Sequence, residues 1–276
     1  MPKPEKFQKF LAFDTSTDRM SIALTDGVRL WQHSGPGGAQ ASSTLIPAIL
    51  ALLDDAGLAL DALDAIVFGR GPGSFTGLRT ACAVAQGLAF GARQGAGLPL
   101  LPVDTLMALA EEARFQQAAL APDKPDQPEI PDSAPLTITA LLDARMDEMY
   151  VQSYEFNSGL CKSIKGCELI RPENLVPGPT PQLFAGNVFG VYAGRLPAAL
   201  AAHPCVPAWP SATALLRLAP ALAAAGHCVA AALALPLYVR DKVAFTSEER
   251  ALAKAEALLA AQATQAAPAT QLADPG

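Results

Sequence analysis

The chain has 276 residues, of which 51% are hydrophobic and 17% are charged, and its formal net charge is −6. This composition excludes a disordered chain, because disorder needs low hydrophobicity and high net charge. No apolar run reaches the ~18 uncharged residues of a membrane-spanning helix, and the acidic balance argues against a protein that grips a nucleic-acid backbone directly.

Cysteine and histidine usage excludes several kinds of site. The five cysteines contain no C-x-x-C pair and are Cys82, Cys161, Cys167, Cys205 and Cys228. An odd, scattered set indicates neither a disulfide framework nor a zinc site, and is typical of a reducing compartment. The three histidines form no H-E-x-x-H motif, so we assign no metal ligand and no catalytic residue. The polar, basic start without an apolar core predicts no secretory signal, and we expect a cytoplasmic protein.

The first part of the chain predicts a five-stranded mixed sheet flanked by helices. The expected elements are strands over 10–13, 20–24 and 28–33, a helix over 41–56, a strand over 65–68, a helix over 74–90, a strand over 99–103 and a helix over 105–115. Asp26-Gly27 predicts a hairpin turn, since both residues tolerate positive φ. Ser34 to Gln40 is expected to be a loop, and Gly57 to end the first helix. Three antiparallel strands followed by two crossover units give this sheet.

The second part predicts a smaller α/β domain. Residues 116–135 hold five prolines and no periodicity, which is typical of a flexible loop. The elements expected after it are strands over 136–142, 148–156 and 161–170 with a turn at 145–147, a strand over 181–185, a helix over 211–225, an extended segment over 236–240 and a helix over 247–262. This second meander predicts domains over 1–104 and 105–246. A C-terminal helix and alanine-rich tail over 247–276 is expected to pack back on the first domain.

The most specific motif is G-R-G-P-G-S-F-T-G-L-R, from Gly69 to Arg79. A glycine-rich turn between a strand and a helix lets backbone N–H groups converge on an anion. No Lys-Ser/Thr follows the last glycine, so this is no Walker A loop, and Ser74 stands where a dinucleotide fingerprint has its third glycine. The residues alone favour the plainer interpretation, a tight turn with Ser74 as helix N-cap.

Asp14-Thr15-Ser16-Thr17 lies at the end of the first strand. Its carboxylate and hydroxyls could hold Mg²⁺ and a phosphate, or form an ordinary turn, and we weigh the two evenly. The residues of a vestigial phosphate or nucleotide site would be Asp14, Thr15, Ser16, Gly71, Gly73, Ser74 and Thr76.

The helices over 41–56 and 74–90 carry more apolar surface than one sheet can cover. This favours a helical protein–protein interface, and the small residues of the second helix let another helix approach closely. The alternative is a layer covered by the chain's own C-terminal helices. The candidate interface residues are Leu45, Ile49, Leu52, Leu53, Phe75, Leu78, Arg79, Cys82, Ala85, Gln86 and Ala89.

Five motifs occur in the order of a known family. They are L-A-F-D-T-S-T at 11–17, the glycine motif at 69–79, P-V-D-T-L at 102–106, L-L-D-A-R-M-D-E-M-Y at 141–150 and P-L-Y-V-R at 236–240. On these residues the chain resembles the TsaB (YeaZ) family from residue 10 to residue 242. The glycine motif together with D-A-R-M-x-E-x-Y is specific, so the risk of a false match is small.

The resemblance implies an α/β fold of the actin-like ATPase (sugar kinase/Hsp70) type with two related mixed-sheet domains. It implies a non-catalytic scaffold or activator that pairs with a TsaD homologue, and with a TsaE homologue, for threonylcarbamoylation of the adenosine beside the tRNA anticodon. The helices over 41–56 and 74–90 correspond to the family's pairing surface, which also forms homodimers. The resemblance further implies that this chain reaches tRNA only through the complex. Any ATP or ADP would likewise be bound within the complex.

The sequence departs from the family in three places. Many members have a histidine or an acidic residue where this chain has Ala41 to Leu45. The loop 116–135 is long, and the tail after residue 247 extends beyond the usual end. No peptidase activity is expected, because the paired-histidine metal motif is missing. The alternative function is an active ATP-dependent kinase or ATPase of the same fold, with Asp14 and Thr15 holding Mg²⁺ and phosphate; against it, no candidate base is placed.

Overall fold

The computed structural model describes residues 8–119, 136–157, 160–178 and 182–240. The chain divides into two compact units, Met1–Val239 and Arg240–Gly276. The predicted tail over 247–276 and most of the predicted loop over 116–135 lie outside the described residues. Within the described ranges, every helix is too short or too polar to cross a membrane.

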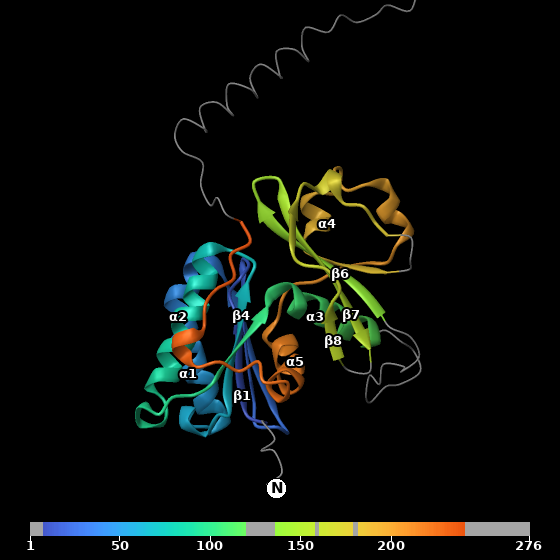
Figure 1. Cartoon of the computed structure of the whole chain (residues 1–276). Helices are drawn as coiled ribbons and strands as arrows, with labels where there is room; N and C mark the ends of the chain where they lie inside the picture. Colours follow the sequence, from blue (N-terminus) through green and yellow to red (C-terminus); the bar gives the residue numbers. More distant parts are fainter. Residues whose placement is uncertain (1–7, 120–135, 158–159, 179–181, 241–276) are drawn as a thin grey trace, which may run out of the picture. The chain divides into compact units, whose positions relative to one another are not determined.

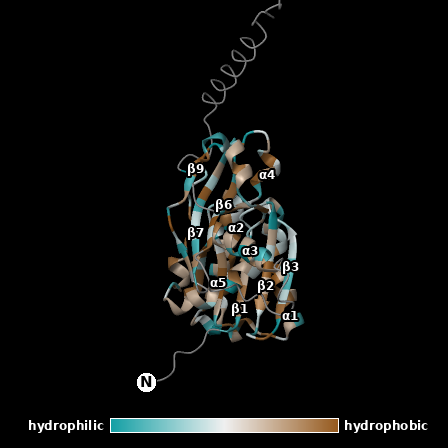
Figure 2. Cartoon of the chain, turned by 90° about the vertical axis from the view of Figure 1, so that its right-hand side faces the viewer, coloured by the Kyte–Doolittle hydropathy of each residue, from teal (hydrophilic) through white to brown (hydrophobic). Residues whose placement is uncertain are grey.

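The first sheet is the predicted five-stranded mixed sheet, in the order β3-β2-β1-β4-β5. Its strands β1, β2 and β3 form an antiparallel meander, and β4 and β5 run parallel to β1. The strands and the helices between them are β1 (Phe10–Asp14), β2 (Arg19–Thr25), β3 (Leu30–Pro36), α1 (Ala41–Ala56), β4 (Ala65–Gly71), α2 (Phe75–Gly91), β5 (Leu100–Asp104) and α3 (Thr105–Ala119). The edge strand β3 is mostly exposed and hydrophilic (Figure 2), which discourages edge-to-edge pairing.

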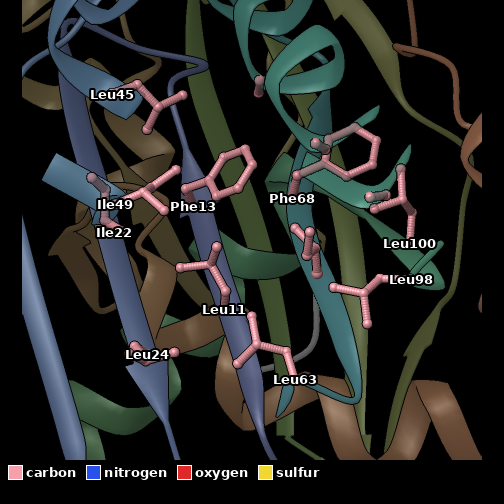
Figure 3. Close-up of a cluster of buried hydrophobic side chains, with 14 of the residues drawn as sticks. Leu11, Phe13, Ile22, Leu24, Leu45, Ile49, Leu63, Phe68, Leu98 and Leu100 are labelled. Atoms are coloured by element: carbon pink, nitrogen blue, oxygen red, sulfur yellow. The ribbon is translucent and has the colours of Figure 1, made fainter. Parts of the chain in front are cut away.

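Helices cover both faces of this sheet (Figure 1). The side chains of Leu11 and Phe13 in β1 lie in a core with α1 and α2, and Figure 3 shows Leu45 and Ile49 of α1 in the same cluster. The alternate residues of β1 pack against α5 (Ala212–Ala224) on the other face. A strand buried on both faces reads as a continuous apolar run, which explains the F-L-A-F sequence.

The second sheet has six strands, in the order β11-β10-β6-β7-β8 with β9 paired to β7. Helix α3 packs against one face of this sheet. The other face is covered by α4 and short 3₁₀ segments rather than by long helices. The elements are β6 (Leu136–Arg145), β7 (Glu148–Asn157), β8 (Leu160–Ser163), β9 (Glu168–Ile170), β10 (Leu183–Gly186), α4 (Val188–Val191) and β11 (Cys205–Pro207).

Several boundaries differ from the sequence prediction. β3 begins at Leu30 because the Asp26 carboxylate accepts the N–H groups of Val28 and Arg29, at 2.9 and 2.7 Å, and holds them in a turn. It continues to Pro36, so the predicted loop over 34–40 is partly strand. The single strand expected over 161–170 is two strands, and β11 was not predicted. Six short 3₁₀ segments were also not predicted: Gly38–Gln40, Leu60–Ala62, Arg93–Gly95, Pro172–Asn174, Ala198–Ala202 and Ala231–Leu233.

The chain returns to the first sheet after the second, which differs from the predicted domain limits of 1–104 and 105–246. Helix α5 packs on β1, β2 and β4. Residues 229–238, which we call the C-terminal strap, then follow α2 (Figure 1). Val229 forms an antiparallel bridge with Leu100 of β5, and the N–H of Leu237 donates to the carbonyl of Arg70 at 2.7 Å. The apolar face of α5 explains this return, because it covers the second face of the first sheet.

A buried carboxylate ties α3 to α5. Glu111 is 2% exposed and accepts two hydrogen bonds from Arg114, at 2.6 and 2.8 Å. It also accepts one from Arg217 of α5 at 2.8 Å. Because α3 also packs against the second sheet, this ion pair stabilises the helix that both sheets share.

We expect Glu111→Ala to lower the free energy of unfolding by about 3 kcal/mol, since breaking a buried ion pair leaves its partners uncompensated. Chemical denaturation of the purified chain measures the change. Lys165→Ala is the control, because the Lys165–Glu168 pair is exposed and such pairs contribute little. Equal effects of the two substitutions would contradict the role given to Glu111.

Candidate functional site

The two sequence motifs at the ends of β1 and β4 lie in direct contact. Because these strands are parallel neighbours, their carboxyl ends meet at one edge of the sheet. The N–H of Ser74 donates to the carbonyl of Ser16 at 2.7 Å. The hydroxyl of Thr15 donates to the carbonyl of Gly77 at 2.7 Å. The structure therefore brings together the two halves of the predicted vestigial site.

Close packing explains the glycines of the motif. A Cβ atom at Gly69 would stand 1.8 Å from Oδ2 of Asp14, and one at Gly77 would stand 1.9 Å from the carbonyl oxygen of Thr15. Gly73 is similarly close to Ser16, and Gly71 has a φ of +125° and lies against the carbonyl of Leu237. No side chain fits at these distances, so the glycines are needed for contacts within the chain itself.

Asp14 is a buried carboxyl group at the centre of this contact. Its Oδ1 accepts from the N–H and the hydroxyl of Ser16, at 2.9 and 2.6 Å. Among the described residues, its Oδ2 has no hydrogen-bond partner. Burial raises the pKa of Asp14, and the two hydrogen bonds from Ser16 offset part of that rise.

The prediction that these loops hold a phosphate stays a prediction. The N–H groups of Ser16 and Ser74 are already donated within the chain, so those two donors are not available to an anion. Ser74 occupies the N-cap position of α2 as predicted, but its side chain makes no capping hydrogen bond. Thr76 is exposed in the first turn of the helix. In the described part of the chain, no three His, Cys, Asp or Glu side chains are placed to hold a metal ion.

We expect Gly77→Ala to destabilise the fold by about 1–3 kcal/mol or more, as overpacking does. Gly87 is the matched control in the same helix, because a Cβ there meets nothing within 4 Å. Gly87→Ala should stabilise the chain by up to about 1 kcal/mol through helix propensity. Thermal unfolding of both variants measures the difference, and a stable Gly77→Ala protein would contradict the close contact.

We expect Asp14→Asn to gain stability relative to wild type as the pH rises above the ordinary carboxyl pKa of 3.8. The folded state holds the Asp14 proton more tightly than the unfolded chain does. The contribution of Asp14 to stability is therefore complete below the unfolded pKa and is lost as the pH rises through the folded value. Denaturation at a series of pH values measures this dependence.

Asp26 provides a control of opposite sign. Hydrogen bonds from the N–H groups of Arg29 and Val28 lower its pKa to about 2. Its contribution to stability is present above the unfolded pKa of 3.8 and is lost as the pH falls from there through the folded value of about 2. Asp26→Asn should thus lose stability relative to wild type at neutral pH and match it in acid. A pH-independent difference for Asp14→Asn would contradict the burial of an orphaned carboxyl oxygen.

Most of the predicted interface residues do not lie on the surface. The same apolar periodicity that suits a partner is used by α1 and α2 to cover the chain's own sheet. Eight of the eleven are buried within the chain: Leu45, Ile49, Leu52, Leu53, Leu78, Cys82, Ala85 and Ala89. A charge placed at Ala85 therefore tests the fold rather than a partner contact.

The other three predicted interface residues contact the C-terminal strap. The Nε2 of Gln86 donates to the carbonyls of Ala231 and Ala234, at 3.1 Å each. Arg79 donates to the hydroxyl of Tyr238 at 3.2 Å, and the rings of Phe75 and Tyr238 are 5.2 Å apart. The chain's own C-terminal region thus covers Phe75 and Gln86 in part, as the alternative interpretation expected, but by an extended strap instead of helices, and Arg79 stays exposed.

A different stripe of each helix remains exposed, and we call it the α1–α2 outer face. It consists of Ile46 and Leu50 of α1 and of Ala83, Gly87 and Phe90 of α2. Leu50 is 55% and Phe90 56% exposed. Spacings of three and four residues place the members of each helix on one side. The near-complete apolar circumference of the first helix was the signal for this second stripe, and sequence reasoning chose the inward one.

Known proteins resemble this chain over most of its length. A family model described as "TsaD: tRNA N6-adenosine threonylcarbamoyltransferase" matches residues 36–272. The "tRNA threonylcarbamoyladenosine biosynthesis protein TsaB" of Escherichia coli is 29% identical over 245 residues, covering 86% of this chain and 96% of the relative. Its Haemophilus influenzae counterpart is 37% identical over 141 residues. This match covers 51% of this chain and 51% of the relative, so it spans about half the length of each.

A solved structure gives the same result. "YeaZ from Pseudomonas aeruginosa" is 35% identical, with a TM-score of 0.70, and the match covers 84% of this chain and 100% of that one. The two mixed sheets and these matches define an α/β protein of the actin-like ATPase fold. Within that class, the chain belongs to the TsaB (YeaZ) family, which confirms the resemblance found in its motifs.

Proposed function

We propose that this chain acts in tRNA threonylcarbamoyladenosine biosynthesis as a non-catalytic scaffold or activator that pairs with a TsaD homologue. Its family relatives carry the name of that pathway. A TsaE homologue joins the pair, and tRNA is reached only through the complex. The observation that carries the proposal is the apolar α1–α2 outer face, which is exposed after the chain's own core and strap are complete.

The α1–α2 outer face has the properties of a helical pairing surface. Ala83 and Gly87 leave room for another helix, since a Cβ at Gly87 would meet nothing within 4 Å. The side-chain ridges of a partner helix can pack into the groove that these small residues leave. Leu50 and Phe90 supply the large apolar side chains that dominate interface energetics. A second copy of this chain would use the same face, because an isologous dimer pairs one patch with itself. The homodimer and the heterodimer therefore exclude each other.

The contact between the motif loops supports a scaffold without chemistry of its own. The backbone donors of Ser16 and Ser74 are used within the chain, and the glycines are packed against its own atoms. The alternative, an active ATPase or kinase, needs those loops to open around a phosphate. Titration of the isolated chain with Mg²⁺-ATP separates the two: saturable binding lost in Asp14→Asn would favour the ATPase.

We expect Leu50→Glu to weaken pairing with the TsaD homologue by about 2 kcal/mol or more, about thirtyfold in Kd, because a charge would be buried at the centre of the interface. Co-expression followed by size exclusion with light scattering measures the complex. Val191→Glu is the control, since Val191 is 59% exposed but lies on α4 of the second sheet. A Leu50→Glu protein that pairs as well as Val191→Glu would overturn the proposed surface.

A further inference from the structure

One arginine differs from all the other arginines that stack on aromatic rings in the described residues. The six stacked pairs are Arg19–Trp209, Arg29–Trp31, Arg79–Phe75, Arg114–Phe156, Arg195–Tyr192 and Arg217–Phe115. Five of these arginines also donate a side-chain hydrogen bond to an acceptor of the chain. Arg19 makes the closest stack, 3.6 Å from the ring centre. Within the described ranges, its guanidinium has no hydrogen-bond or ion-pair partner.

Arg19 and Trp209 line a hollow of about 230 Å³. Register places Ser21 directly opposite Ser34 on β2 and β3. Because side chains alternate along a strand, Arg19 and Ser21 point to the same face of the sheet. That face is the one covered by α5, since the N–H of Ala212 donates to the hydroxyl of Ser21 at 2.9 Å. The hollow thus lies where β2 and β3 extend past the start of α5.

A carboxylate lines the same hollow as Arg19. Glu112 of α3 lines it, and its Oε2 accepts from the hydroxyl of Ser211 at 2.6 Å and from Arg217 at 2.7 Å. Burial alone would raise the pKa of Glu112, but these hydrogen bonds and the charge of Arg217 lower it. The hollow is therefore lined by Arg19, which is exposed and has no partner among the described residues, and by a carboxylate whose charge Arg217 partly balances.

We infer that this hollow binds a small carboxylate that also carries an ammonium or hydroxyl donor, a molecule of amino-acid size. A guanidinium packed 3.6 Å from the centre of an indole ring has a planar N–H fork that matches the geometry of a carboxylate. Glu112 suits the second donor and disfavours a doubly charged phosphate. The volume is below the ~300 Å³ at which pockets for drug-sized ligands begin, so the ligand is small.

Tryptophan fluorescence tests the site directly. The chain has two tryptophans, so Trp31→Phe leaves Trp209 as the only reporter. We would titrate this full-length variant with glycine, L-serine, acetate and inorganic phosphate at constant ionic strength. Saturable changes are expected for glycine and L-serine, weaker binding for acetate, and the weakest for phosphate. Adding Arg19→Ala should weaken glycine binding about tenfold or more, as loss of a charged hydrogen bond does.

Two further variants keep the result specific. Arg29→Ala removes the cation–π contact between Arg29 and residue 31. Because Arg29 is already paired with Asp26, this substitution should leave binding unchanged. Glu112→Gln should reduce the preference for glycine over acetate, a readout that a purely structural role would not move. Absence of saturable binding, or equal affinity in Arg19→Ala, would overturn the site. Tighter binding of phosphate than of every carboxylate would overturn the ligand class.

Discussion

The rest of the structure depends on the close contact between the end of β1 and the turn after β4. Three glycines make it possible, because a side chain at Gly69, Gly73 or Gly77 would collide with residues 14–16. The contact fixes where α2 begins and in which direction it leaves the sheet. The strap then follows α2, and the carbonyl of Leu237 lies against Gly71. A motif whose spacing suggests an anion cradle is, in this chain, a packing element.

The position of α2 decides which residues are left for a partner. One side of the helix faces β4 and the core, and another is covered by the strap through Gln86 and Arg79. The remaining stripe, with Ala83, Gly87 and Phe90, is exposed together with part of α1. The face proposed for a partner is therefore the part of α1 and α2 that the fold itself does not use.

Sequence reasoning predicted the features that local chemistry determines. Asp26-Gly27, the apolar run of β4 and Gly57, which ends α1 in a left-handed conformation, each act within a few residues, and the elements they define are confirmed. The features that were missed join distant residues. The Gln86–Ala231 hydrogen bond spans 145 positions. Arg19 at the start of β2 stacks on Trp209, which follows β11 of the second sheet. Which stripe of α1 faces inward likewise depends on the sheet beneath it, and no pattern within the helix specifies it.

The strap also has a consequence for synthesis of the protein on the ribosome. Chains are made from the N-terminus, and domains generally fold as they emerge. The first sheet is complete in sequence at Asp104, yet α5 and the strap that cover it come more than 100 residues later. Throughout that interval one face of the sheet is covered only in part, by α3, and the side chain of Gln86 lacks the carbonyls of the strap. The nascent N-terminal half therefore exposes apolar surface of the kind that promotes aggregation until translation has passed residue 238.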